Sequence, residues 1–311
     1  MELFRVKKDI QFMSYGKLTT AISLLTFFAA IFFLFSNGLN RSVEFTGGTI
    51  MEVRYASAPN LEDIRQRIAS LDLGEVQVQN LGSAQDVMLR LPVKKDVSAA
   101  KLSEEVLTLL RANQVSVDVR KVEFVGPSVG EELVTEGLMA LLFVCLGIVG
   151  YLALRFEWRF AVSALVANLH DVVIILGCFA AFQWEFSLTV LAGILAVLGY
   201  SVNESVVVFD RIRENFRDPS LRDMTIPQLI DNAITATMSR TIITHGSTEA
   251  MVLSMLIFGG PVLHGFAMAL TIGIVFGIYS SVLVASPMAL MLGVKREHMI
   301  KMITVKEEAV V

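Results

Sequence analysis

Acidic side chains lie inside segments that are otherwise apolar, and they are the first residues that could carry chemistry. Residues 198–216 read LGYSVNESVVVFDRIRENF, and Glu204 lies in their apolar part, before the charged cluster begins. A second apolar segment contains Asp171 and its neighbour His170 near its middle. A charge at the centre of a membrane costs about 2.5–3.5 kcal/mol on insertion scales, so such residues usually mark ion pathways or proton relays. We therefore predict a proton relay that contains Glu204 and Asp171.

Arg240 begins a third polar group, which is placed to meet Glu204. The residues after Arg240 include Thr241 and His245, which share one helix face because they are four positions apart. The segments that carry Glu204 and Arg240 are expected to be antiparallel neighbours, with the two charges at compatible depths. An opposite charge is the most favourable partner for a buried ion. We predict a buried Glu204–Arg240 ion pair as part of the relay.

Polar residues in transmembrane helices also have a purely structural explanation. Their side chains often only bond neighbouring helices, at about 0.6–2 kcal/mol for each hydrogen bond. We assign this role to the Ser and Thr residues, and both roles stay open for His170, Asn203 and His245. An intramembrane hydrolase built from Ser201, His245 and Asp171 is a further alternative. The sequence contains neither an H-E-x-x-H motif nor a serine-hydrolase signature, which disfavours it.

Long apolar helices are needed to position these residues, and the composition indicates them. The chain has 311 residues, of which 54% are hydrophobic and 18% are charged, and its mean hydropathy is +0.62. A helix needs about 20 predominantly apolar residues to cross a bilayer. The six predicted spans are residues 18–36, 134–154, 160–182, 186–209, 240–259 and 264–292. The sequence therefore predicts a polytopic α-helical membrane protein.

The remaining composition indicates no bound group. Cys145 and Cys178 both fall in apolar segments, where a thiol is usually a small packing residue. We predict no disulfide, no metal site and no cofactor. The net charge of −4 says little about partners in so apolar a chain, and no nucleic-acid partner is predicted.

The distribution of Lys and Arg predicts the orientation, because cytoplasmic flanks retain positive charge. The short connections 183–185 and 259–263 contain neither Lys nor Arg, whereas the connections on the other side are rich in both. We therefore expect both termini to be cytoplasmic. The cytoplasmic segments are then 1–17, an amphipathic loop at 210–239, and 293–311, and the exported segment is 37–133.

The exported segment has the pattern of a small α+β domain. Residues 43–55 are predicted as one strand, interrupted at Gly47 and Gly48 by a bulge or a close backbone approach. Asn60 and Ser98 each begin a predicted helix. The other predicted strands are 76–80, 87–91 and 115–125. The resulting order βαββαβ is the ferredoxin-like arrangement.

These motifs resemble the SecD/SecF family of accessory proteins of the Sec translocase, within the RND superfamily of proton-driven transporters. The family signature D-F-x-G-G-T is similar to the run that includes Glu44, Phe45, Gly47, Gly48 and Thr49. Other matching motifs are the His-Asp pair at 170–171, GYSVNESVVVFDRIREN at 199–215, FGGP at 258–261 and KREHM at 295–299. The resemblance covers essentially the whole chain.

Three positions depart from the family pattern. Glu44 and Glu204 stand where the family usually has Asp, so the charge is kept with one methylene of extra reach. His245 stands where the family usually has Ser, which adds an ionisable group. These departures place a longer carboxylate and an imidazole in the expected proton pathway.

The resemblance implies the function. It implies a subunit without a catalytic site, which uses the proton motive force in the bacterial cytoplasmic (inner) membrane to promote polypeptide export, with Glu204 and Arg240 as the proton-linked pair. The implied partners are SecD, the SecYEG translocon, YajC and YidC, the unfolded exported polypeptide and membrane lipids. Two alternatives remain at this point: an RND-type exporter of small molecules or lipids, and a purely structural scaffold for SecD.

Overall fold

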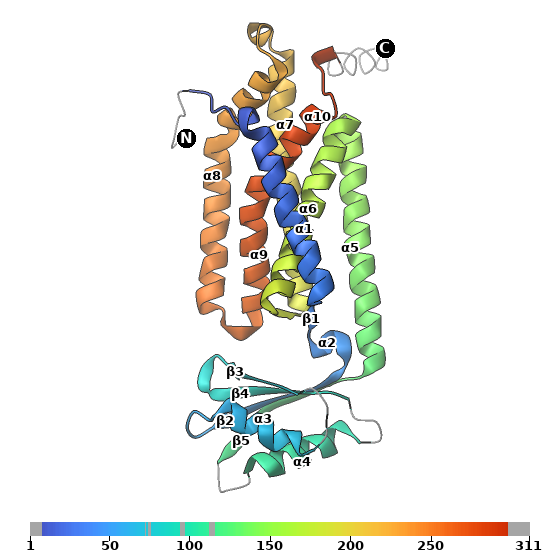
Figure 1. Cartoon of the computed structure of the whole chain (residues 1–311), viewed down its shortest axis with the longest axis vertical. Helices are drawn as coiled ribbons and strands as arrows, with labels where there is room; N and C mark the ends of the chain where they lie inside the picture. The colour runs from blue at the N-terminus through green and yellow to red at the C-terminus, as the bar shows by residue number, and fades with distance from the viewer. Residues whose placement is uncertain (1–7, 72, 74–75, 94–96, 112–115, 298–311) are drawn as a thin grey trace, which may run out of the picture.

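The structure is a computed structural model, and it describes residues 8–71, 73, 76–93, 97–111 and 116–297. A bundle of long helices forms one part of the molecule, and a small α+β domain lies at one end of the bundle (Figure 1). The first and last described segments lie at the opposite end of the bundle. Parts of the predicted cytoplasmic ends, 1–7 and 298–311, are outside the described residues.

Six segments of the described chain are long and apolar enough to cross a membrane, which agrees with the six predicted spans. The helices are α1 (Gly16–Ser36, preceded by η1, Met13–Tyr15), α5 (Pro127–Arg155), α6 (Trp158–Phe182), α7 (Leu188–Arg217), α8 (Ile226–Phe258) and α9 (Gly260–Ser280). A π-helical turn, η3 (Ser281–Ala285), and α10 (Ser286–Met291) continue α9. The prediction of a polytopic helical membrane protein is confirmed.

The segment 210–239, predicted as an amphipathic cytoplasmic loop, is mostly helical and continues the two helices on either side. Helix α7 runs to Arg217, a short helix η2 (Pro219–Leu221) follows, and α8 begins at Ile226. Thr225 and Gln228 form a capping box that starts α8 early. Apolar residues of this stretch, such as Ile212 and Phe216, are buried in the core of the bundle.

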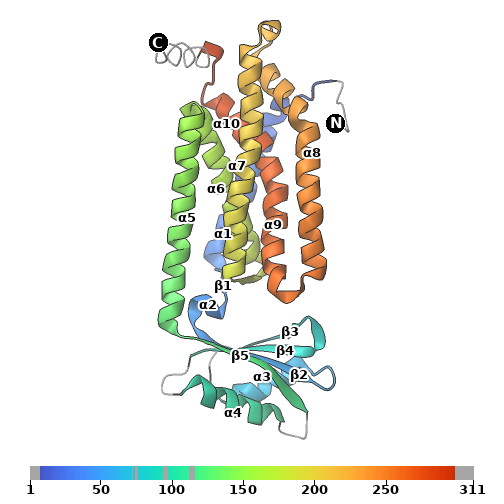
Figure 2. The same cartoon turned by 180° about the vertical axis from the view of Figure 1, so that it is seen from behind.

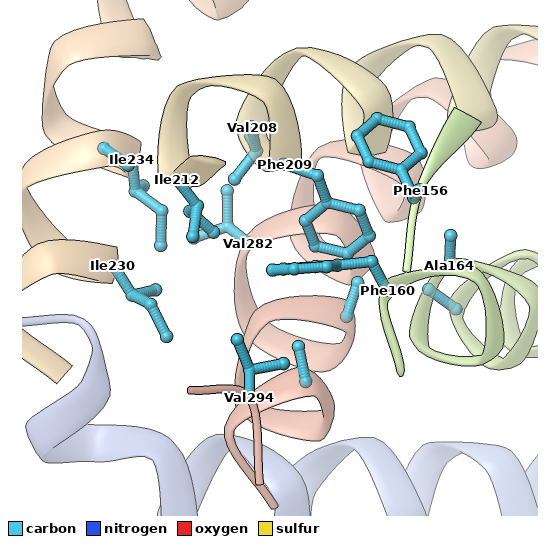
Figure 3. Packing of buried hydrophobic residues seen from close by; sticks show 14 of the residues in the cluster. Phe156, Phe160, Ala164, Val208, Phe209, Ile212, Ile230, Ile234, Val282 and Val294 are labelled. Carbon is cyan, nitrogen blue, oxygen red and sulfur yellow. The ribbon is translucent and has the colours of Figure 1, made fainter. Parts of the chain in front are cut away.

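The largest apolar cluster among the described residues (Figure 3) lies at the end of the bundle that is away from the α+β domain in Figure 1. Phe156, Phe160 and Phe209 form its aromatic part, with ring centroids 4.8–6.4 Å apart. Ile212 from α7 and Ile230 from α8 extend the cluster and are fully buried. This packing holds the ends of α5, α6, α7 and α8 together.

The α+β domain has the predicted ferredoxin-like order. Its elements are β2 (Gly48–Tyr55), α3 (Leu61–Ala69), β3 (Gln77–Leu81), β4 (Ser83–Leu91), α4 (Ala99–Arg111) and β5 (Val117–Val125). The sheet has the antiparallel order β3-β4-β2-β5. As predicted, Asn60 begins α3, since its Oδ1 accepts a hydrogen bond from the Glu62 backbone N–H at 2.9 Å.

The two faces of the sheet have different neighbours. Helices α3 and α4 cover the face that points away from the bundle (Figure 2). Apolar residues between them, such as Met51, Val53, Leu89, Ile68 and Val106, are completely buried. The other face points toward the helix bundle, and nearly all of β5 is exposed. The domain thus presents an open sheet face to the ends of the membrane helices.

The single strand predicted for residues 43–55 is wrong in its first part. Residues Val43–Thr46 form a short helix, α2, and the strand β2 begins only at Gly48. The predicted close backbone approach is present at the two glycines, whose φ angles are +72° and +146°. A Cβ atom on Gly48 would lie 2.7 Å from the Leu91 carbonyl oxygen. Positive φ values and this crowding explain why glycine is required here.

A second, very small sheet joins the two parts of the molecule. Strand β1 (Asn40–Arg41) follows α1 and pairs in parallel with β6 (Glu185–Phe186), which lies between α6 and α7. The chain therefore enters the α+β domain directly beside the beginning of α7.

Candidate functional site

Two of the buried polar side chains of helix α7, Ser201 and Glu204, lie about one turn apart and belong to different polar groups. Ser201 and Glu204 are 1% and 4% exposed. We name the two groups the Asp171 centre and the Glu204 centre. The Asp171 centre consists of Asp171, His170, Ser23, Ser201 and Ser280. The Glu204 centre consists of Glu204, Thr241 and His245 with the cavity beside them.

The Asp171 centre surrounds its carboxylate with donors from three helices. The Ser201 and Ser280 hydroxyls, from α7 and α9, each donate to Asp171 Oδ2 at 2.7 Å. His170 Nδ1 lies 3.3 Å from Asp171 Oδ1. Asp171 itself is 1% exposed, so these groups replace the water that it would bind outside a membrane. No Lys or Arg ion pair to Asp171 is found among the described residues.

His170 extends this centre to the first helix. Its Nε2 lies 2.9 Å from the Ser23 hydroxyl of α1, and its ring stacks on Phe27 with centroids 6.1 Å apart. In the tautomer that carries the proton on Nδ1, His170 donates to Asp171 and accepts from Ser23. The Asp171 centre thus connects α1, α6, α7 and α9.

The Glu204 centre holds its carboxylate with fewer groups. Thr241 Oγ1 of α8 donates to Glu204 Oε1 at 2.5 Å, and His245 Nδ1 lies 3.8 Å from Glu204 Oε2. The same His245 Nδ1 lies 3.0 Å from the Thr241 carbonyl oxygen, which accepts its proton in the Nδ1–H tautomer. His245 Nε2 has no hydrogen-bond partner in the described part of the chain.

The predicted Glu204–Arg240 ion pair is not formed. Both residues line one cavity of about 270 Å³, but no ion pair joins them among the described residues, and the Arg240 side chain is exposed. Consecutive residues of a helix point about 100° apart, so Arg240 faces outward where Thr241 faces α7. The Thr241 hydroxyl therefore takes the place at the carboxylate that was predicted for the arginine.

The cavity beside Glu204 makes this centre accessible. It lies between α7 and α8, and Asn203, Arg240 and Thr244 are exposed residues of its lining. Asn203 therefore faces the cavity rather than a neighbouring helix. His245 lies on the buried side of the same cavity, at 3% exposure.

The sequence does not indicate a role in the two centres for four hydroxyl groups. For Ser201 and Thr241 it predicts structural hydrogen bonds, with Ser201 also part of the hydrolase alternative, and it does not single out Ser23 and Ser280. Each of them contacts an ionisable side chain. The available signal was weak, because Ser and Thr in helices commonly bond their own backbone four residues back.

The alternative hydrolase triad is not assembled. Ser201 bonds Asp171 in one centre, whereas His245 belongs to the other centre. A nucleophilic serine needs a base within hydrogen-bond reach. No hydrogen bond joins Ser201 to His245 in the described part of the chain.

Residues 40–49, which contain Gly47 and Gly48 and are named the Gly-Gly segment, lie at the base of the α+β domain. The Glu44 carboxylate accepts a hydrogen bond from the Leu188 backbone N–H at 2.7 Å, at the start of α7. Phe45 is buried and stacks on Phe186 with ring centroids 5.7 Å apart. After Gly47 and Gly48, Thr49 is buried in β2, where it pairs with Leu91 and Phe124 of the neighbouring strands. This segment therefore contacts both parts of the molecule.

Comparison with protein families gives two matches. A family model described as "Protein export membrane protein SecD/SecF, C-terminal" matches residues 105–295. A second, described as "SecD/SecF GG Motif", matches residues 32–59, which include Glu44 and both glycines.

Individual proteins with similar sequences cover almost the whole chain. The chain is 42% identical over 309 residues to protein translocase subunit SecF of Vibrio alginolyticus. The aligned region covers 99% of this chain and 98% of the relative. It is 39% identical over 305 residues to protein translocase subunit SecF of Escherichia coli O157:H7, covering 97% of this chain and 94% of the relative.

Solved structures show the same fold as part of a longer chain. A crystal structure of SecDF, a translocon-associated membrane protein from Thermus thermophilus, matches with a TM-score of 0.84 and 34% identity. The match covers 93% of this chain but only 39% of the SecDF chain. A structure of SecDF in a super-membrane-facing form matches with a TM-score of 0.70 and 31% identity, covering 99% of this chain and 41% of that chain. The chain therefore belongs to the SecD/SecF family of protein export membrane proteins.

Proposed function

We propose that this protein is a Sec translocase subunit that acts with SecD to promote polypeptide export across the bacterial inner membrane at the expense of the proton motive force. The relatives that match it over nearly their full length are named as translocase subunits. The matched SecDF chains are more than twice as long, and a SecD partner supplies a counterpart for the remainder. In this assembly the termini are cytoplasmic and the α+β domain is exported, as the Lys and Arg distribution predicts.

The observation that carries the proton coupling is the pair of buried carboxylates that α7 contacts or carries, Asp171 of α6 and Glu204 of α7 itself. Asp171 and Glu204 are held by hydroxyl and imidazole groups, without a bound Lys or Arg among the described residues. Protonation of such a carboxylate leaves no unpaired cation buried in the membrane. Movement of one elementary charge across 100 mV releases about 2.3 kcal/mol, which is enough to shift a two-state helix packing.

Glu204 is the residue that exchanges the proton in this proposal. It lines the cavity that Asn203 and Arg240 also line, so a proton can reach it from the surface of the bundle. Arg240 stays within the same cavity and can approach the carboxylate when the carboxylate loses its proton. Its role is then to stabilise the deprotonated state transiently, which agrees with the absence of a permanent ion pair among the described residues.

Glu204→Gln tests the proposal directly. The amide keeps the size of the side chain and an acceptor for Thr241 but cannot release a proton. In proteoliposomes that contain the subunit, SecD and the translocon, we expect the stimulation of polypeptide export by an imposed proton motive force to be lost. The matched control is Glu131→Gln, the same chemical change at an exposed position of α5.

The outcomes separate the proposal from its alternatives. Loss of stimulation with a normal amount of assembled complex supports a proton-coupled subunit. Unchanged stimulation in Glu204→Gln contradicts it and favours a structural scaffold for SecD. Loss in Glu131→Gln as well would mean that general destabilisation, and not proton exchange, explains the result.

A further inference from the structure

The Gly-Gly segment and the start of α7 are joined by backbone and side-chain contacts that the proton-coupling proposal does not use. Strands β1 and β6 pair in parallel, with Asn40 opposite Glu185 and Arg41 opposite Phe186. The Ser42 backbone N–H donates to the Phe186 carbonyl oxygen at 2.9 Å. The chain entering the α+β domain is thus bonded to the residues directly before α7.

Glu44 adds a charged contact to the helix itself. Its Oε2 accepts from the backbone N–H of Leu188, the first residue of α7, at 2.7 Å, and from the Ser42 hydroxyl at 3.2 Å. The first N–H groups of a helix have no partner within the helix and carry its positive dipole end. A carboxylate that accepts from such a group is well placed electrostatically, and it adds to the cap that the Ser187 hydroxyl forms with the Val190 N–H at 3.4 Å.

Close packing around the two glycines restricts the movement of helix α2, which carries Glu44. A Cβ on Gly47 would lie 2.9 Å from the Cα of Pro127, at the start of α5, and a Cβ on Gly48 would lie 2.7 Å from the Leu91 carbonyl oxygen. A Cβ on Gly130 would lie 2.9 Å from the Phe45 carbonyl oxygen. Helix α2 is therefore tightly packed between the sheet and α5, with little space to move separately.

A partly buried ion pair attaches β6 to the sheet as well. Arg90 of β4, which is 5% exposed, pairs with Glu185. Arg90 also donates to Gln77 Oε1 at 3.0 Å, and Gln77 donates to Asn40 Oδ1 at 3.2 Å. These bonds run from the sheet to both strands of the β1–β6 pair, so the pair moves with the α+β domain.

We propose that the Gly-Gly segment is a rigid coupling between α7 and the α+β domain, with Glu44 as the positioning residue that fixes the start of α7 to the domain. Glu204 lies about 24 Å along the same helix from Leu188, at about 1.5 Å per residue. A rotation or translation of α7 at Glu204 is then transmitted to Leu188, and through Glu44 and the β1–β6 pair to the domain. This inference rests on the proposed function in assigning the proton-linked movement to Glu204.

Distances between two spin labels test the coupling in the complex with SecD. Both native cysteines are replaced by Ala, and labels are placed at exposed residues Glu104 of α4 and Ser254 of α8. With Glu44 present, Glu204→Gln is expected to shift the distance distribution between domain and bundle. In Glu44→Ala, the same change at Glu204 is expected to produce a much smaller shift, because only the β1–β6 pair then connects the start of α7 to the domain.

Two further variants separate coupling from stability. Glu44→Gln keeps an oxygen that can accept from Leu188 and is expected to retain part of the shift. Glu44 and Glu52 both line a cavity of about 790 Å³ between the α+β domain and the bundle. Glu52→Ala removes the second carboxylate, which has no hydrogen bond to α7 in the described part of the chain, so it is expected to retain the full shift. A full shift in Glu44→Ala overturns the proposal, and so does its loss in Glu52→Ala.

A disulfide between Asn40→Cys and Glu185→Cys, which are opposite each other in the β1–β6 pair, decides the case independently. A rigid coupling predicts that the oxidised variant exports polypeptide as well as its reduced form. Export that is lost on oxidation and restored by dithiothreitol would show that the contact must open, which overturns the coupling. If Glu204→Gln causes no shift even with Glu44 present, the proposed function fails while this cross-link still decides the coupling.

Discussion

The Asp171 and Glu204 centres bind their carboxylates in different ways. Asp171 is in contact with two hydroxyls and an imidazole, whereas Glu204 has one hydroxyl at 2.5 Å and an imidazole at 3.8 Å. The Asp171 centre joins four helices, and the Glu204 centre joins only α7 and α8 beside a cavity. A closed centre suits a carboxylate that holds helices together, and an open centre suits one that exchanges a proton. The first should therefore respond to mutation mainly in stability, and the second mainly in export.

Asp171→Asn is expected to have the largest effect on stability. The asparagine keeps one oxygen for the hydroxyls of Ser201 and Ser280, but its NH₂ group replaces the oxygen that faces His170. His170 Nδ1 can accept from this NH₂ group in the tautomer that carries the proton on Nε2, but the bonds to residue 171 are then neutral. A hydrogen bond to a charged group contributes about 1.5–3 kcal/mol against about 0.5–1.5 kcal/mol for a neutral one, so the centre is weakened. In Glu204→Gln, by contrast, the NH₂ group can point into the cavity, so thermal unfolding of the purified complex should shift less. A larger shift for Glu204→Gln would contradict the distinction between closed and open centres.

The organisation of the membrane part could be predicted because it depends on segment length and hydropathy. Six long apolar segments and the βαββαβ order follow from these patterns, and both agree with the structure. The partner of Glu204 could not be predicted in the same way. The sequence indicates how deep Arg240 lies along α8, but the direction of its side chain depends on the rotation of that helix against α7. A difference of one residue, Arg240 or Thr241, changes which side chain meets the carboxylate.

The donors of the Asp171 centre illustrate a second limit. Ser280 is the last residue of α9 and is followed by the π-helical turn η3. A π-helical turn inserts a residue into the helix and changes which side chains face inward. No residue type specifies such a turn, so the contact of Ser280 with Asp171 was invisible in the sequence. The packing of the stretch 210–239 is hidden for a related reason, since amphipathicity indicates that one helix face is covered but not which helices cover it.

Ser201→Ala is expected to have the next largest effect on stability. The change removes one of two 2.7 Å donors to Asp171 Oδ2. Hydrogen bonds between membrane helices contribute about 0.6 kcal/mol on average and at most about 1.7 kcal/mol. Ser163→Ala is the matched control, because Ser163 is equally buried but donates only to the Arg159 carbonyl oxygen of its own helix. Equal unfolding temperatures for the two variants would show that the hydrogen bond from Ser201 to Asp171 does not contribute to stability.

His245→Ser tests whether the imidazole of the open centre is needed for proton exchange at Glu204. The imidazole lies 3.8 Å from Glu204, while the Thr241 hydroxyl already accounts for the short hydrogen bond. We expect the protein to remain stable and its proton-driven export to fall by about fivefold, which corresponds to about 1 kcal/mol. His264→Ser is a control at the far end of α9, away from both centres. A loss as complete as that in Glu204→Gln would mean that His245 is an essential proton carrier and not an auxiliary group.

Ser23→Ala is expected to have the smallest effect, although it removes the bond between α1 and the Asp171 centre. The lost contact is a single neutral hydrogen bond to His170 at 2.9 Å, worth about 0.6 kcal/mol in a membrane. Helix α1 stays attached to α6 by close packing, since a Cβ on Gly177 would collide with Ala30. Thr26→Ala is the control, because Thr26 donates only to carbonyl oxygens of its own helix. If Ser23→Ala destabilises the protein as much as Asp171→Asn, then His170 and α1 are essential to the closed centre, and its stability does not come mainly from the two hydroxyls on Oδ2.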